Sequence, residues 1–194
     1  MNQPMAVRIV TDTASDFTVE QAQQANLTLV PMPITHEGKT YRDAYDLSKS
    51  DFYHLLTNSD SLPKTAQPAP QDFLTHFLDA KQHGDSVVCI VLSSALSGTL
   101  QSALIAVGLT EDLDVALVDS LSATVGERLL VQEACRMRDA GGKTAQEIAE
   151  ALRLLVPRVR IFACLDTLEY LARGGRIPKA AAGVGMLVKL KPIV

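Results

Sequence analysis

The sequence lacks an excess of positive charge. Its 18 lysines and arginines are outnumbered by 22 aspartates and glutamates, which gives a net charge of -4 and a pI near 5.5. A protein that binds nucleic acid neutralises phosphates with a basic surface. Nucleic acid is therefore not an expected partner, and no polybasic run is present that would hold the chain on anionic lipid.

Long apolar runs are also missing. The late apolar stretch at residues 180–188 ends at Lys189, whereas a helix that crosses a membrane needs about 20 apolar residues. The opening MNQPMAVRIVTDTASD has no charged segment followed by a long apolar one, which a signal peptide would have. We therefore expect no membrane span and a cytoplasmic location.

Cysteine and histidine are scarce. The three cysteines are widely spaced in apolar surroundings, which is typical of reduced core thiols and not of a disulfide framework or a zinc site. The four histidines have no partners at the spacing of a metal site, so no metal and no cofactor are expected. These residues are Cys89, Cys135, Cys164, His36, His54, His76 and His83.

Five short apolar runs predict β-strands at residues 7–10, 27–34, 87–92, 115–118 and 159–164. Three of them are apolar at consecutive positions, as in a parallel sheet that is covered on both faces. Helical spacing of apolar residues separates the strands at 100–107 and 145–152. The sequence thus predicts an α/β fold: a three-layer domain with a mainly parallel sheet at residues 1–160, and the incomplete beginning of a second α/β domain at 161–194.

Local signals add detail to this fold. The sequence HEGKT at residues 36–40 predicts a hairpin turn on Gly38. Capping boxes predict helix starts at Ser48 with Asp51 and at Thr144 with Glu147.

Hydroxyl-rich loops follow the predicted strands, at residues 11–16, 93–99 and 119–122. Ligands of open parallel sheets bind beyond the carboxyl ends of the strands. Ser97 and Gly98 are expected at the start of a helix, where free amides and a partial positive charge attract anions. The competing interpretation is that Ser97 only caps this helix.

Two further segments have both a functional and a structural interpretation. In KTAQPAP the prolines hold Thr65 and Gln67 in an extended segment, although Pro70 also suits a helix start. Arg173 and Arg176 flank a pair of glycines and could form a docking or anion site, although a glycine cap with a following proline ends a helix equally well.

Two other classes of function stay open at this point. A serine-dependent hydrolase or transferase could use Ser93, Ser94 or Ser97, but the chain has no GxSxG motif and no histidine after His83. A phosphate- or nucleotide-binding module could use the same helix start, but GxxxxGK[ST] is absent and Gly183-Val-Gly185 lacks a third glycine.

Taken together, TDTASD, KTAQPAP, LSSALSGTLQSA, VDSLSATVGE and LEYLARGGRIPK resemble the DegV family in order and spacing over essentially the whole chain. The resemblance implies a bacterial, non-catalytic lipid-binding protein that encloses one long-chain fatty acid, such as palmitate, between two domains. It also implies a partner, a fatty acid kinase, which phosphorylates the bound acid to an acyl-phosphate that enters phospholipid metabolism.

The resemblance also assigns residues. Thr65, Ser97 and Gly98 match the family's carboxylate-binding positions, and Arg176 matches an arginine near the head group and the kinase-facing surface. Further candidates for head-group or kinase contacts are Arg173, Ser93, Ser94, Asp119 and Ser120.

This chain departs from the family pattern in two places. The usual TSQP reads TAQP here, so any role of that serine is lost. Members of the family are usually longer by much of the second domain, which lines the acyl tunnel and supplies a histidine near the carboxylate. We therefore expect the apolar residues of 184–194 to be covered by a missing segment or by a second copy in a homodimer.

Overall fold

The computed structural model describes residues 6–59, 61–177 and 191–193. The chain divides into two compact units, Met1–Val159 and Arg160–Val194, and each unit is described by itself.

A four-stranded parallel sheet forms the centre of the first unit. It contains β1 (Val7–Asp12), β2 (Leu27–Val30), β6 (Ser86–Val91) and β7 (Val115–Asp119), in the order β2-β1-β6-β7. Every residue of β6 is buried, as the consecutive apolar pattern predicted for a strand covered on both faces.

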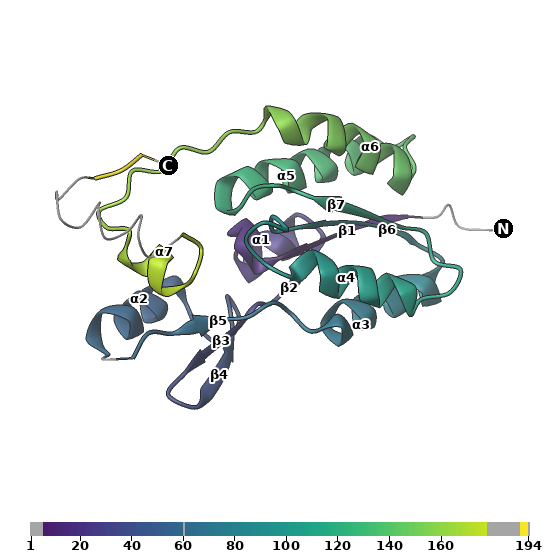
Figure 1. The fold of residues 1–194 in the computed structure, drawn as a ribbon. Coiled ribbons are helices and arrows are strands. Elements are labelled where there is room, and N and C mark those ends of the chain that lie inside the picture. Colours follow the sequence, from purple (N-terminus) through teal and green to yellow (C-terminus); the bar gives the residue numbers. More distant parts are fainter. Residues whose placement is uncertain (1–5, 60, 178–190, 194) are drawn as a thin grey trace. The chain divides into compact units, whose positions relative to one another are not determined.

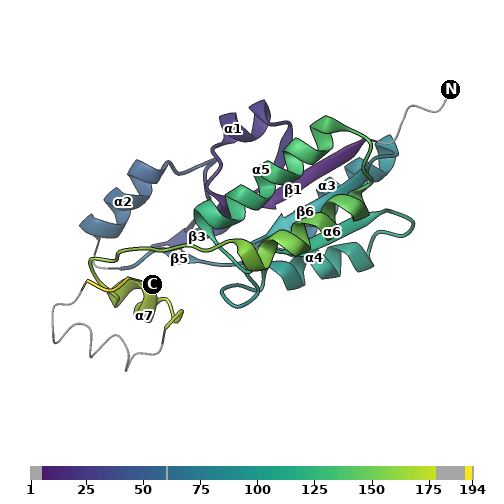
Figure 2. The same ribbon diagram turned by 90° about the horizontal axis from the view of Figure 1, so that it is seen from above.

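Helices cover both faces of this sheet (Figures 1 and 2). Helices α1 (Val19–Gln24), α5 (Thr124–Ala140) and α6 (Ala145–Leu155) pack on one face, and α3 (Pro70–His83) and α4 (Thr99–Gly108) pack on the other. Neighbouring strand residues point to opposite faces, so Val88 belongs to the first core and Cys89 to the second. The predicted three-layer α/β domain is confirmed.

A small antiparallel sheet adjoins this domain. Its strands are β3 (Pro33–His36), β4 (Lys39–Arg42) and β5 (Lys64–Thr65), in the order β4-β3-β5. The predicted hairpin turn is confirmed, with positive φ angles of 49° at Glu37 and 78° at Gly38. Helix α2 (Lys49–Asn58) and the short helix η1 (Thr13–Ser15) complete this region.

The predicted strand at residues 27–34 is wrong as a single element. Its two ends, β2 and β3, belong to different sheets. Pro31 lies between them, and proline has no N–H group with which to continue a ladder of hydrogen bonds. Apolar composition gave no sign of this break, because the residues on both sides of it are apolar.

The helix starts agree with the sequence signals. Ser48 and Asp51 form a reciprocal capping box at α2, and Thr144 and Glu147 do the same at α6. Cys89 and Cys135 are buried free thiols as expected, but Cys164 is exposed, so its assignment to a core is wrong.

The second unit is described at residues 160–177 and 191–193. It contains α7 (Glu169–Arg173), which ends at Gly174 as the glycine pair suggested. The predicted strand at 159–164 is wrong: in the described part of the chain this segment forms no strand, and Cys164 makes an isolated bridge with Ile193. Most of the apolar residues expected to need a cover at 184–194 lie outside the described residues, and Ile193 is 72% exposed. No helix in the described parts of the chain is long and apolar enough to span a membrane.

Glu127 is the buried acid of the first core. Its side chain is fully buried at the start of α5; Oε1 accepts a hydrogen bond from Thr11 Oγ1 at 3.1 Å, and Oε2 has no partner among the described residues. Burial, reinforced by the nearby Asp12, raises the pKa of Glu127 well above 4.5. The neutral acid is therefore the form that the fold favours.

We predict that Glu127→Gln stabilises the protein more at pH 8 than at pH 4.5. At low pH Glu127 is protonated in both states. As the pH rises the unfolded chain ionises first, so stability is lost until the pH passes the raised pKa of the folded state. Denaturant unfolding of both proteins at several pH values would measure this, with the exposed Glu150→Gln as control. A difference between wild type and Glu127→Gln that does not depend on pH would contradict the neutral assignment.

Candidate functional site

Asp12 organises the carboxyl end of the parallel sheet. It is the last residue of β1 and fully buried. Its Oδ2 accepts a hydrogen bond from the Leu92 amide at 2.9 Å, and its Oδ1 accepts one from the Ala14 amide at 2.8 Å. Burial raises the pKa of Asp12 to about 6, although these two hydrogen bonds favour the charged form. One carboxylate thus joins the ends of β1 and β6.

Asp119 has a similar role at the end of β7. Its Oδ1 accepts hydrogen bonds from the amides of Ser94 at 3.2 Å and Leu121 at 3.0 Å. The Ser93 amide also donates to the Ser122 carbonyl at 2.9 Å. The loops after β6 and β7 are therefore bonded to each other.

The four head-group candidates of these two loops have different environments. Ser93 and Ser120 are buried, and their hydroxyls bond to loop backbone at Ala95 and Ser122. The side chain of Asp119 holds the loop backbone, and Ser94 is exposed. Three of the four candidates therefore bond within the loops that support the site.

Ser97 and Gly98 lie at the start of α4, as the sequence predicted. Gly98 occupies the position before the helix, and no side chain caps this terminus. Ser97 Oγ lies 2.9 Å from Thr99 Oγ1, so the interpretation of Ser97 as the helix cap is wrong. The first turn of α4 contains no acidic residue, which leaves the positive end of the helix dipole uncompensated from within the helix.

Thr65 belongs to a segment that reaches this helix start. It pairs with Ile34 in the small sheet, and the Ala66 amide donates to the Pro33 carbonyl at 3.0 Å. Two residues after Thr65, Gln67 Nε2 donates to Ser102 Oγ at 3.3 Å. The segment that contains Thr65 and the start of α4, which are far apart in the sequence, therefore lie together in the structure.

Gln67 was expected in the extended KTAQPAP segment but was not among the predicted site residues, and its partners in the site could not be predicted from the sequence. A Cβ atom built on Gly98 would lie 2.0 Å from Gln67 Oε1, so the carboxamide occupies the space that a side chain at Gly98 would need. The available signal was a side chain with donor and acceptor groups in a segment fixed by prolines, which is too general to identify a partner.

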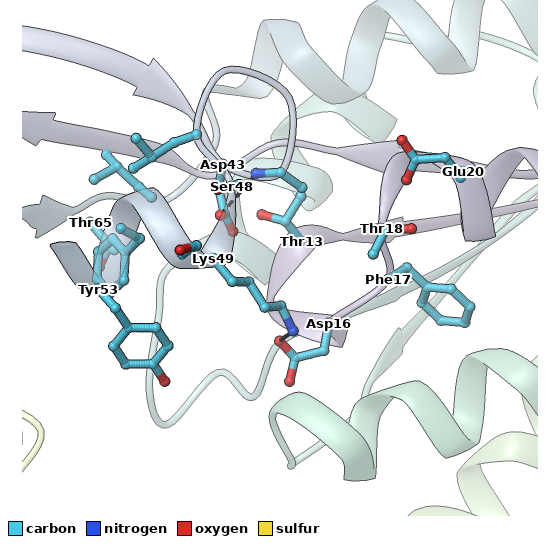
Figure 3. A pocket seen from close by; sticks show the side chains of 15 residues that line it. Thr13, Asp16, Phe17, Thr18, Glu20, Asp43, Ser48, Lys49, Tyr53 and Thr65 are labelled. Atoms are coloured by element: carbon cyan, nitrogen blue, oxygen red, sulfur yellow. Dashed lines mark hydrogen bonds and ion pairs between the residues drawn. The ribbon is translucent and has the colours of Figure 1, made fainter. Parts of the chain in front are cut away.

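A pocket of about 760 Å³ opens beside Thr65 (Figure 3). Its walls come from η1, the start of α1, β3 and α2. Ile34, Leu47 and Phe52 supply apolar surface, and the ion pair between Lys49 Nζ and Asp16 Oδ1 at 2.8 Å supplies a polar part. The volume lies within the roughly 300–1,000 Å³ that is usual for small-molecule sites.

Arg173 and Arg176 belong to the second unit, and both are exposed. Arg173 Nη1 donates to Glu169 Oε1 at 3.1 Å within α7, and Arg176 Nη1 donates to the Gly174 carbonyl at 2.5 Å. Among residues 6–59, 61–177 and 191–193, no group of three or more His, Cys, Asp or Glu side chains is placed to hold a metal ion.

We predict that Asp119→Ala destabilises the protein by about 2 kcal/mol, because two loop amides lose a charged acceptor. The amides of Ser94 and Leu121 should exchange with deuterium faster, as measured by hydrogen exchange, whereas amides in β6 keep their protection. Glu111→Ala, which removes an exposed carboxylate before β7, is the control. Unchanged exchange at Ser94 would contradict the assigned role of Asp119.

Comparisons with known proteins agree on one family. The family model described as an uncharacterised protein of the DegV family matches residues 6–194. A DegV domain-containing protein of Caldanaerobacter subterraneus subsp. tengcongensis is 35% identical over 97% of this chain and 66% of its own length. One from Listeria monocytogenes is 34% identical over all of this chain and 68% of its own.

Solved structures give the same result. DegV from Bacillus subtilis, a fatty acid binding protein, is 29% identical with a TM-score of 0.88, over 98% of this chain and 67% of its own. A DegV family protein from Thermus thermophilus, solved for its fatty acid binding, is 30% identical with a TM-score of 0.84, over 97% and 67% of the two chains. A stearic acid-binding protein from Eubacterium ventriosum is 29% identical with a TM-score of 0.80, over 91% and 63%.

This chain spans about two thirds of the length of these relatives. The family model covers nearly all of the chain, and the sequence relatives and the structures point to the same fold. The chain belongs to the DegV family.

Proposed function

We propose that this chain binds one long-chain fatty acid through its carboxylate, at Thr65, Ser97 and the Gly98 amide, without transforming it. The observation that carries the proposal is the contact of Gln67 with Gly98, which joins the Thr65 segment to the uncapped start of α4. Fatty acid binding by the relatives from Thermus thermophilus and Bacillus subtilis supports it.

The chemistry of the site suits a carboxylate. Hydroxyls and a helix N-terminus stabilise a negative charge by hydrogen bonds and by the helix dipole, without a buried cation. The apolar wall of Ile34, Leu47 and Phe52 begins beside Thr65 in the same pocket. A hydroxyl group next to apolar surface is the arrangement that an amphipathic ligand requires.

The tail and the head group contribute differently to binding. About fifteen methylenes at about 0.8 kcal/mol each supply most of the gross affinity when they are buried. Each hydrogen bond to the charged head group adds about 1.5–3 kcal/mol. The tail therefore accounts for most of the affinity, and the polar loops fix the orientation of the carboxylate.

The proposal that the protein is not an enzyme rests on the environments of its serines. A nucleophilic serine needs a neighbouring base, but Ser97 Oγ contacts Thr99 Oγ1 and Ser93 Oγ accepts from the Ala95 amide. Ser59 Oγ does lie 2.9 Å from His36 Nε2, yet Glu37 approaches that same ring nitrogen at 4.0 Å. In a catalytic triad the acid would orient the other nitrogen.

A carrier of this kind would present the carboxylate to a fatty acid kinase in the cytoplasm. The acyl-phosphate formed there would enter phospholipid synthesis. Arg173 and Arg176 support this part of the proposal, since both are exposed cations that suit a docking surface.

We predict that Thr65→Val and Ser97→Ala each weaken binding of a fluorescent long-chain fatty acid by roughly ten- to a hundredfold, the effect of one charge-assisted hydrogen bond. Both variants should keep the wild-type melting temperature within a few degrees. Thr75→Val, on the exposed surface of α3, is the matched control. If inorganic phosphate or ATP binds more tightly than the fatty acid, or both variants keep full affinity, the proposed site is wrong.

We predict that Arg173→Ala and Arg176→Ala slow phosphorylation of the bound acid by a bacterial fatty acid kinase several-fold, with fatty-acid affinity nearly unchanged. Exposed interface charges act mainly on encounter and orientation. Rates at limiting carrier concentration measure the effect, and Arg136→Ala on α5 is the control. Normal rates for both variants would show that these arginines take no part in presentation.

A further inference from the structure

The carboxamide of Gln67 fills the space above Gly98. A Cβ at Gly98 would lie 2.0 Å from Gln67 Oε1 and 2.7 Å from Cδ, far closer than packed atoms approach. Gln67 Nε2 donates to Ser102 Oγ at 3.3 Å, and Ser102 is 1% exposed in the first turns of α4. Gln67 is an exposed residue, and its carboxamide contacts Ser102 and the space above Gly98.

The backbone on both sides of Gln67 is fixed. Thr65 is held in the small sheet by its pairing with Ile34, and the Ala66 amide bonds to the Pro33 carbonyl. Pro68 is buried directly after Gln67 and has a restricted φ angle. Two extended residues span at most about 7 Å, so the contact at Gly98 limits where the Thr65 hydroxyl can lie relative to the start of α4.

From this contact we infer that Gln67 is a positioning residue, which sets the separation between Thr65 and the pair Ser97 and Gly98. The inference rests on the proposed function and deepens it. Thr65 is carried by the small antiparallel sheet, and Ser97 and Gly98 are carried by the parallel sheet and α4. The side chain of Gln67 joins these two supports at the start of α4.

A carboxylate ligand is sensitive to the separation between Thr65 and the pair Ser97 and Gly98. Its two oxygens are held at a fixed distance by one carbon, so donors on both sides reach them together only when the donors are spaced to within roughly 0.5 Å. A ligand with one hydroxyl in place of the carboxylate can bond to either donor alone. Loss of the spacing should therefore lower the affinity for an acid and leave that for an alcohol of the same length nearly unchanged.

Two explanations account for a glycine at position 98: the ligand approaches its backbone, or the carboxamide of Gln67 needs the space of a side chain there. A methyl group at Gly98 would push away the end of Gln67, which is flexible enough to move without unfolding the helix start. If Gly98 mattered only because the ligand approaches its backbone, Gln67 would have no influence on the effect of Gly98→Ala. The two explanations differ in a double-mutant cycle.

Binding of palmitate and hexadecanol to Gln67→Ala, Gly98→Ala and the double variant would test the inference. Gln67→Ala should lower palmitate affinity about tenfold and hexadecanol affinity less than about twofold, the tenfold loss corresponding to about 1.4 kcal/mol. Gly98→Ala should also lower palmitate affinity. The double variant should be no weaker than the weaker single variant, because the methyl group then has no carboxamide to displace.

Other outcomes overturn the inference. Additive losses in the double variant would show that Gly98 and Gln67 act independently. Equal losses for palmitate and hexadecanol would show a general structural defect, and unchanged palmitate binding in Gln67→Ala would show that Gln67 is dispensable. Gln71→Ala, on the exposed surface of α3, is the matched control.

Palmitate and hexadecanol binding by the wild-type protein distinguishes a failure of this inference from a failure of the proposed function. If it binds palmitate no better than hexadecanol, there is no carboxylate site, and both proposals fail. If it prefers palmitate and Thr65→Val removes that preference while Gln67→Ala does not, the carboxylate site stands and only the role of Gln67 is contradicted.

Discussion

The carboxyl edge of the parallel sheet depends on the buried carboxylate of Asp12. Its two oxygens accept the amides of Ala14 and Leu92, which fixes the ends of β1 and β6 in one arrangement. A buried amide without a hydrogen-bond partner costs free energy. Because Asp12 pairs these two amides, the hydrogen bonds offset the cost of burying its charge. Because its pKa is raised only to about 6, Asp12 is mostly ionised at neutral pH and remains a strong acceptor there.

Elements defined by local signals could be predicted from the sequence. The consecutive apolar residues of β6, the glycine turn of the hairpin and the capping boxes at Ser48 and Thr144 each depend on neighbours in the chain. The division of residues 27–34 into two strands depends on which sheet each half joins, and at 159–164 the structure has an isolated bridge between Cys164 and Ile193 where the sequence predicts a strand. Tertiary pairing of this kind leaves no periodic signal.

In the candidate site, too, local features could be predicted from the sequence and tertiary contacts could not. The sequence predicts Ser97 and Gly98 at a helix start because the helical pattern begins directly after them. The contacts of Gln67 with the start of α4 could not be predicted, since Gln67 lies in the loop after β5 and its hydrogen-bond partner Ser102 comes 35 residues later in α4. The pocket beside Thr65 likewise combines η1, β3 and α2, which meet only once the chain is folded.

The identity of the ligand that stays bound through purification would show whether the protein binds a fatty acid. Native mass spectrometry of the purified protein, followed by organic extraction and identification of the released compound, would identify it without any assumption about the site. We expect one long-chain fatty acid per chain, intact and not esterified. A bound nucleotide or phosphate compound, or ester hydrolysis by a protein free of fatty acid, would contradict it.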